Sequence, residues 1–225
     1  MNESTLRKLG GTCSIFVGIS YIVVGIMYLL LPAEQKAGGD AGAFLSSFAQ
    51  APLMVTLEYW GFALGAVFAL AVVPAIAERV RSANEGWVRW TSNLATVGFS
   101  VAAIQYFRYL GLYPANAAAY AAGDSTARAA IEANQATMAL DPDGWLIFGA
   151  VGLWFLVVNL LALRGGQWPK TLAYVGVAGA AAYWLVVAGF VFEIDLFVTI
   201  AAAAAAVIGP IWYIWSGLTL RRPSA

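Results

Sequence analysis

The chain has 225 residues, of which 61% are hydrophobic and 11% are charged, and its 12 basic residues equal its 12 acidic ones. A soluble domain is about half apolar and about a quarter charged. This composition excludes a disordered chain, a basic nucleic-acid-binding protein and an ordinary soluble enzyme, and it predicts an all-α polytopic membrane protein embedded in the lipid bilayer.

Six segments are long and apolar enough to cross a bilayer as helices, which takes about 20 residues each. We expect one domain, residues 1–225, built as a single bundle of six transmembrane helices. The expected spans are residues 10–31, 52–77, 87–113, 145–163, 171–192 and 196–220. We expect Pro32 and Pro114 to end the first and third spans, because proline removes a helix hydrogen bond.

The last two spans are inferred from length. Between Thr171 and Leu220 the only charged residues are Glu193 and Asp195. Fifty residues of helix would be about 75 Å long, more than twice the ~30 Å thickness of a bilayer core. We therefore expect the chain to turn back once, at the two acidic residues.

Basic residues collect on one side of the predicted bundle, which indicates the cytoplasmic side. Lys36 and Arg128 lie on the other side, with Arg108 just inside the third span. The nine residues on the first side are Arg7, Lys8, Arg79, Arg81, Arg89, Arg164, Lys170, Arg221 and Arg222. We therefore expect a multi-pass protein of the plasma (inner) membrane with both termini in the cytoplasm.

The long connection of residues 114–144 is expected to form a small helical cap on the extracytoplasmic side. Asp124 can cap a helix that runs to about Leu140, where Asp141 and the proline after it would end the helix. A shorter amphipathic segment, residues 43–48, lies in the preceding outer connection.

The sequence contains no histidine and a single cysteine, Cys13. Haem, chlorophyll, zinc or copper held through imidazole is therefore excluded, as is acid–base chemistry through histidine. We expect no metal site, no cofactor and no catalytic residue, because familiar enzyme signatures such as GxSxG, HExxH and the P-loop are missing.

Two charged residues are expected inside the membrane at the same depth. Glu58 lies six residues after Pro52, and Arg108 lies six residues before Pro114. At 1.5 Å per residue, both would lie about 9 Å below the outer ends of neighbouring helices. Glu58 and Arg108 are therefore predicted to meet in the outer leaflet.

The residues around this pair fit a pocket that faces the bundle. Gly61 and Gly65 share the helix face of Glu58 and suit close helix approach, whereas small polar residues share the face of Arg108, with Gln105 just beyond its edge. One hypothesis is a ligand pocket formed by Glu58, Gln105 and Arg108. The alternative is an ion pair that only holds two helices together. Proton-coupled transport is disfavoured, because no chain of titratable groups continues to the cytoplasmic side.

Three of the nine tryptophans, Trp60, Trp154 and Trp184, fall near the middle of their spans. They could line a cavity for a lipid, a quinone or a polyene, or they could serve ordinary packing. Five others are expected in a belt at the cytoplasmic interface, where indole rings are enriched: Trp87, Trp90, Trp168, Trp212 and Trp215.

The chain resembles the small uncharacterised six-helix membrane proteins of bacteria and archaea that are grouped as domains of unknown function. The resemblance rests on three features: the short basic N-terminus, the long loop between the third and fourth spans, and the stretch Leu161-Ala-Leu-Arg164-Gly-Gly-Gln-Trp168-Pro-Lys170, which leads into a Gly/Ala-rich helix. It implies a membrane protein and assigns no functional residue.

Three functions are consistent with the sequence. The leading hypothesis is a non-enzymatic protein that binds or moves a small or lipophilic ligand in the outer half of the bundle, with Glu58 and Arg108 orienting the polar end of the ligand. The second is a structural or regulatory subunit that packs on another membrane protein, or on a second copy, through faces such as Ala201–Ala206. The third is an intramembrane enzyme that acts on lipids.

Overall fold

The computed structural model describes residues 3–36, 40–135 and 137–222, and these residues form helices and loops without a strand. The helices are α1 (Glu3–Leu30), α2 (Ala41–Gln50), α3 (Leu53–Val80), α4 (Glu85–Ala122), α5 (Ser125–Gln135), α6 (Val151–Gly165), α7 (Lys170–Val191) and α8 (Asp195–Arg221), with short 3-10 turns at Ala33–Gln35 and Arg81–Ala83. A π-helical turn, Trp145–Ala150, precedes α6.

Five of the described helices are long and apolar enough to cross a membrane: α1, α3, α6 together with its π turn, α7 and α8. The chain is therefore a helical, multi-pass membrane protein. α4 has the length but not the hydropathy, because polar residues such as Arg89, Asn93 and Arg108 occupy it. The expectation of six spans thus depends on whether α4 crosses the membrane.

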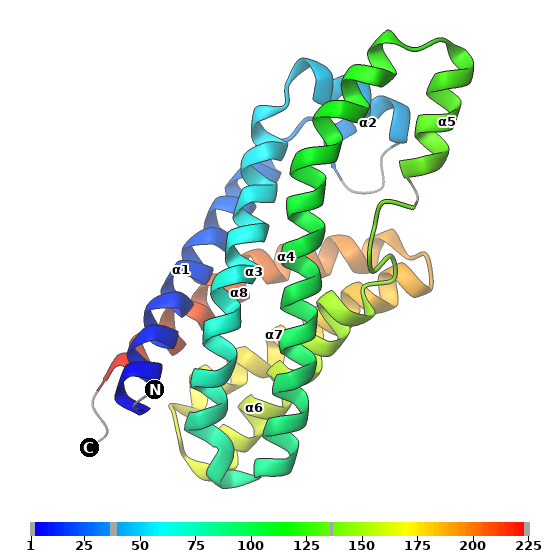
Figure 1. Cartoon of the computed structure of the whole chain (residues 1–225). Helices are drawn as coiled ribbons and strands as arrows, with labels where there is room; N and C mark the ends of the chain where they lie inside the picture. Colours follow the sequence, from blue (N-terminus) through cyan, green and yellow to red (C-terminus); the bar gives the residue numbers. More distant parts are fainter. Residues whose placement is uncertain (1–2, 37–39, 136, 223–225) are drawn as a thin grey trace.

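The long helices form a closed ring of neighbours in two layers. Figure 1 shows α1, α3 and α4 side by side along the length of the molecule, with α6, α7 and α8 packed behind their lower half. The ring closes through contacts of α4 with α6 and of α1 with α8. The two described ends of the chain meet there, because Arg7 Nη2 donates a 2.8 Å hydrogen bond to the carbonyl of Arg222.

Small residues set the distance between the helices of the ring. A Cβ atom on Gly61 would lie 2.7 Å from Val24 of α1, and one on Gly65 would lie 3.5 Å from Ser20. The expected close approach at these two glycines is therefore confirmed, and the partner helix is α1. On its other side, α1 meets α8, where Ser14 Oγ lies 2.9 Å from Ser216 Oγ.

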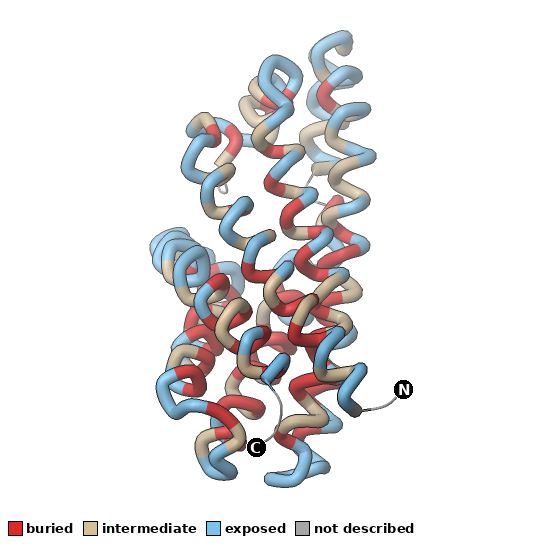
Figure 2. Tube along the Cα trace, turned by 90° about the vertical axis from the view of Figure 1, so that its left-hand side faces the viewer, coloured by how far each residue is buried: buried red, intermediate tan, exposed pale blue. Residues whose placement is uncertain are grey.

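The apolar interior consists of two separate clusters. The larger one fills the lower half, where all six long helices meet around residues such as Trp154 and Phe155. The smaller one lies in the upper half, around Leu45, Phe48 and Val55. Figure 2 shows the buried residues concentrated in the lower half. Glu58 of α3 lies along the chain between Val55 of the smaller cluster and Ala66 of the larger one.

The upper end carries α2 and α5, which pack against α4 and against each other. Asp40 caps α2 and Asp124 caps α5, each accepting a hydrogen bond from the backbone N–H three residues later, at 2.8 and 2.9 Å. Tyr120 of α4 donates a 2.6 Å hydrogen bond to Glu132 of α5, and this bond raises the pKa of Tyr120.

Two helix ends differ from the sequence-based expectation. α4 does not end before Pro114 but continues to Ala122, because the lost N–H bond is a local defect in a stretch of good helix formers. α5 ends at Gln135 rather than near Leu140. There the Thr137 hydroxyl bonds the carbonyl of Asn134 at 2.8 Å, an interaction that competes with helix continuation.

The turn between α7 and α8 lies at the two acidic residues, as predicted. α7 ends at Val191, Glu193 adopts a positive φ of 55°, and α8 begins at Asp195. The hairpin is tilted against α1, α3 and α4, so that its tip reaches only the middle height of the molecule in Figure 1. The upper half of the front layer therefore has no long helix behind it.

Candidate functional site

Glu58 lies on the buried face of α3, between the two apolar clusters. The side chain is only 7% exposed. Across residues 3–36, 40–135 and 137–222, no cation lies within ion-pair distance of its carboxyl group, and no hydrogen bond to it is formed. A buried carboxyl group without a partner is unfavourable by several kcal/mol, so such groups in membrane proteins are commonly functional.

Arg108 does not pair with Glu58, contrary to the sequence-based prediction. The acidic residue at the other end of α3, Glu78, does form an ion pair, with Arg81 at 3.1 Å. Arg108 is half-buried, one turn along α4 from the buried Gln105. The predicted ion pair between Glu58 and Arg108 is therefore not formed.

The small polar residues of α4 do not mark the buried face of this helix. Asn93 and Thr96, which share the helix face of Arg108, are exposed rather than turned into the bundle. Thr96 and Ser100 satisfy their hydroxyl groups on the carbonyls four residues earlier, at 2.9 and 2.8 Å. Because these bonds form within the helix, a hydroxyl group does not reveal which face is buried.

Gln105 points inward as a buried side chain and fastens the loop that follows α5. Its Oε1 accepts a 2.8 Å hydrogen bond from the backbone N–H of Leu140. Close by, the amide of Asn116 donates to the sulfur of Met138 at 3.3 Å. Residues 138–140, which precede α6, are thereby fixed on α4.

Aromatic rings line the layer that contains Glu58. Tyr59 is the next residue after Glu58 on α3, and Phe62 lies one turn further along the same helix. The rings of Tyr59 and Tyr106 lie 5.7 Å apart, and Tyr106 of α4 stacks on Phe62 at 4.6 Å. An acidic side chain at the level of several packed aromatic rings is the main feature of this candidate site.

These rings belong to a column that runs along the bundle. Towards the upper end, Tyr59 stacks on Tyr113 at 5.6 Å, and Tyr113 lies 4.9 Å from Phe44 of α2. Towards the lower end, Phe62 contacts Tyr21 of α1 at 6.4 Å, and Tyr21 contacts Tyr213 at 5.6 Å. The column connects the two apolar clusters past Glu58.

The structure does not bring the three mid-span tryptophans together. Trp154 is fully buried in the lower cluster, 6.3 Å from Phe99 and 6.1 Å from Trp212. Trp60 and Trp184 are 44% and 40% exposed and face outward on α3 and α7. A shared cavity lined by all three is therefore not formed, since similar depth does not fix which side of each helix is buried.

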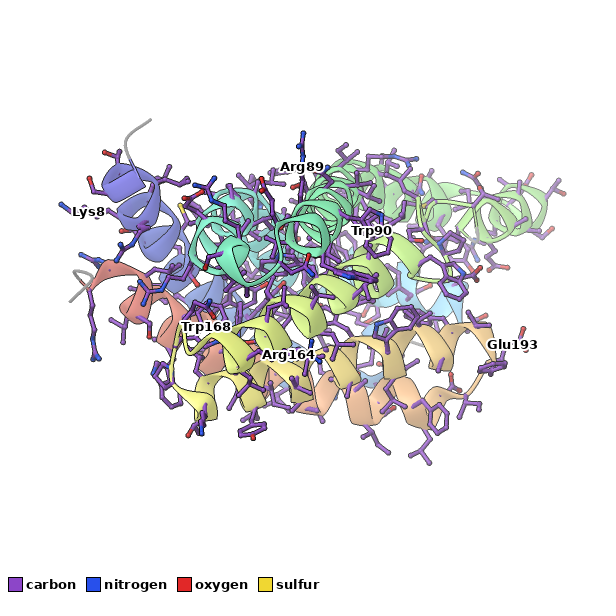
Figure 3. The ribbon with its side chains drawn as sticks, turned by 90° about the horizontal axis from the view of Figure 1, so that it is seen from below. Lys8, Arg89, Trp90, Arg164, Trp168 and Glu193 are labelled. Atoms are coloured by element: carbon purple, nitrogen blue, oxygen red, sulfur yellow. The ribbon has the colours of Figure 1, made fainter. Side chains whose placement is uncertain are left out.

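The interface belt of tryptophans is also divided. Trp87 and Trp90 are exposed at the start of α4 and contact each other at 5.4 Å. Trp168 and Trp212 are buried instead, in contact with each other at 6.2 Å. Figure 3, which looks onto this end, shows Arg89 pointing away from the bundle and Glu193 at the tip of the α7–α8 hairpin.

A buried amide in α6 was not found from the sequence. Asn159 is fully buried, and its Oδ1 accepts a 3.1 Å hydrogen bond from the indole of Trp212. Its Nδ2 donates to the carbonyl of Phe155 at 2.7 Å, and its amide packs directly on Gly176 of α7. An asparagine inside an otherwise apolar span, opposite a glycine in the next span, was the available signal.

These observations define a helical multi-pass membrane protein with an unpartnered carboxyl group in an aromatic layer. Residues 16–217 match the family model described as "Domain of unknown function (DUF4386)", and the chain belongs to this family. The predicted relationship to an uncharacterised family is thus confirmed. Neither the curated proteins nor the solved structures contain a match to the chain.

Proposed function

We propose that α4 is the sixth membrane span and that both termini lie in the cytoplasm at the inner membrane. The nine basic residues gathered at the lower ends of the long helices support this orientation. α2 and α5 then form a small extracytoplasmic cap. Residues 1–225 would constitute one six-helix domain, with Glu58 in its outer half.

The proposed function is the binding of a small or lipophilic ligand at Glu58, as part of its movement or sensing in the membrane. The observation that carries this proposal is the buried, unpartnered carboxyl group of Glu58. A structural carboxyl group needs a cation or hydrogen-bond donors nearby, and Glu58 lacks both within the described ranges. A bound ligand would supply the missing partner.

Gln105 and the loop it holds complete the proposed site. The hydrogen bond from Leu140 fixes the loop next to α4, so that the loop can exclude water and limit access from the outer side. A ligand that extends beyond the Glu58 layer is expected to contact four further residues: Arg108, Trp60, Trp154 and Trp184. Their positions in the structure do not converge on it.

Native mass spectrometry of gently extracted protein tests the proposal. We expect a small molecule at fixed stoichiometry on the wild-type chain and its loss from the Glu58→Gln variant. Glu78→Gln is the matched control, because Glu78 lies on the same helix and pairs with Arg81 on the surface. Retention of the same molecule by Glu58→Gln would contradict the proposed site.

The subunit hypothesis is the second candidate, favoured by two outward faces. Arg89, Asn93 and Thr96 form an exposed polar ridge on α4, which is costly against lipid. Ala202 and Ala203 are exposed on α8. Co-purification of a second polypeptide whose binding is lost in Ala203→Phe or Asn93→Leu would favour this function over ligand binding.

A further inference from the structure

We propose that the ligand of the Glu58 site is an organic cation, a substituted ammonium or phosphonium group with apolar substituents. This inference rests on the proposed function and names the ligand class of the same site. It follows from two properties of the layer around Glu58, its charge and its ring faces.

The first property is an acidic side chain that has no ion-pair partner in the described part of the chain. When it is ionised, a carboxylate offers only acceptors, so its natural partner is a cation or a donor. Arg108, the basic residue of α4 nearest to this level, forms no ion pair with Glu58. The other acids of α3 and α4, Glu78 and Glu85, lie at the opposite end of the molecule. An anionic ligand would therefore meet repulsion from the ionised group, whereas a cation would compensate its charge.

The second property is the set of aromatic rings at the level of Glu58, which lie within one turn of it on α3 and on the neighbouring helix α4. Tyr59, Phe62 and Tyr106 contribute aromatic faces within one layer, with centroid separations of 5.7 and 4.6 Å for the pairs that include Tyr106. Ring faces attract cations, and carboxylate-plus-aromatic sites recognise substituted ammonium groups. The same rings accept the apolar substituents of such a cation.

A metal ion fits this layer poorly. Hard cations take six or more oxygen ligands, mostly carboxylates and carbonyls. In the described part of the chain, no group of three or more acidic or cysteine residues lies together. One carboxylate among tyrosine and phenylalanine rings suits a large, weakly hydrated cation.

The cation could be a free lipophilic molecule or the choline group of a lipid. Both carry the same quaternary centre, and Glu58 is proposed to lie in the outer half of the membrane, within reach of either. A competition experiment, in which a choline lipid is added to the bound lipophilic cation, distinguishes these two sources.

Equilibrium dialysis with a matched pair of probes tests the ligand class. Tetraphenylphosphonium and tetraphenylborate carry the same four phenyl groups and opposite charges. For the full-length wild-type protein in neutral maltoside detergent, we expect saturable binding of the phosphonium at one per chain. We expect its affinity to exceed that of the borate by about tenfold or more, because a charge-assisted contact contributes at that scale.

Four variants, one of them a control, connect the binding to the named residues. Glu58→Gln should weaken phosphonium binding about tenfold or more, whereas Glu78→Gln should leave it unchanged. Tyr106→Leu should weaken it severalfold, and Tyr106→Phe should retain it, since phenylalanine keeps the ring face. Each variant is accepted only if its size-exclusion profile and helix content match those of the wild type.

The outcomes distinguish this inference from the proposed function. Saturable borate binding that depends on Glu58 or Gln105 would keep the ligand site and overturn the cation class. Binding of both probes that never saturates and is unchanged in Glu58→Gln would overturn both. If short-chain phosphatidylcholine competes with the phosphonium but matching phosphatidylglycerol does not, the cation is a lipid headgroup; if neither competes, it is a free cation.

Discussion

At the scale of single residues, the polar groups of the bundle interior fall into two kinds. Gln105 and Asn159 are buried with partners at 2.7–3.1 Å. Ser14 likewise donates to the carbonyl of Tyr213 at 2.6 Å. Glu58 is 7% exposed and has no hydrogen bond or ion pair among the described residues. Ser92 Oγ and the indole N–H groups of Trp154 and Trp168 are also buried without a partner there. Glu58 differs from these groups because it can ionise, so it is the group to test for function.

Gln105→Leu should release the loop that follows α5. The substitution removes the acceptor of the Leu140 N–H and leaves that donor unpaired, a loss of about 1–3 kcal/mol. We expect faster amide hydrogen exchange at Leu140 by at least tenfold, with the lower half of the bundle unaffected. Gln105→Glu keeps the acceptor and should restore the protection; equal exchange rates in both variants would contradict the role of this bond.

Gly176→Ala should disturb the contact between α6 and α7. A methyl group at this position would collide with the amide of Asn159 and strain the bond to Trp212, at a cost of about 1–3 kcal/mol. The readout is the loss of thermal stability in detergent. In an Asn159→Ala background the same glycine substitution should cost much less, and additive losses would rule out the direct contact.

At the scale of helices, the sequence predicted which segments are helical, and their approximate lengths, better than which side of each helix is buried. All six long segments are helical, with ends within a few residues of the predicted ones except at two places: α1 begins at Glu3 rather than at residue 10, and α4 continues past Pro114. A run of apolar residues indicates how long a membrane helix is. It does not indicate which face of that helix is buried, because the faces that contact lipid and the faces that contact other helices are both apolar. Glu58 was predicted to face the bundle and is buried, whereas Arg108, predicted to face it too, is half-buried and unpaired with Glu58, and Trp60 faces outward.

Asp141 should stabilise the start of the fourth predicted span. Its Oδ2 accepts hydrogen bonds from the N–H groups of Leu146 and Ile147, at 2.8 and 2.7 Å. Asp141→Ala should lower the free energy of unfolding by about 1–2 kcal/mol, as loss of a helix cap does. Asp143→Ala serves as the neighbouring control, and an equal effect of both substitutions would contradict a specific cap.

At the scale of the whole molecule, the arrangement of the helices follows from contacts that one sequence does not reveal. The glycines of α3 were recognised as a packing face, yet their partner proved to be α1. The tilt of the α7–α8 hairpin (Figure 1) depends on how six helices fill the lower core together. Consequently the depth of Glu58 could be predicted from the sequence, whereas the packing of Tyr59, Phe62 and Tyr106 at that level could be seen only in the structure.

The proposed orientation predicts which loops face the outside. In a Cys13→Ser background, which removes the single buried thiol, Ala129→Cys on α5 should react with a membrane-impermeant maleimide added to intact cells. Ala83→Cys, on the turn between α3 and α4, should react only after the membrane is opened. Both positions are exposed in the structure. The opposite labelling pattern would invert the topology.

The measurement that tests the account most directly is the thermal unfolding of wild-type and Glu58→Gln protein, each with and without tetraphenylphosphonium. Because Glu58 has no structural partner, the glutamine variant should unfold at the same temperature as the wild type or higher. The phosphonium should raise the midpoint of the wild type and leave that of the variant unchanged, since only a bound ligand stabilises the folded state. A clear fall in the midpoint of Glu58→Gln without ligand, together with an equal phosphonium shift in both proteins, would show that Glu58 is a structural residue and contradict the account.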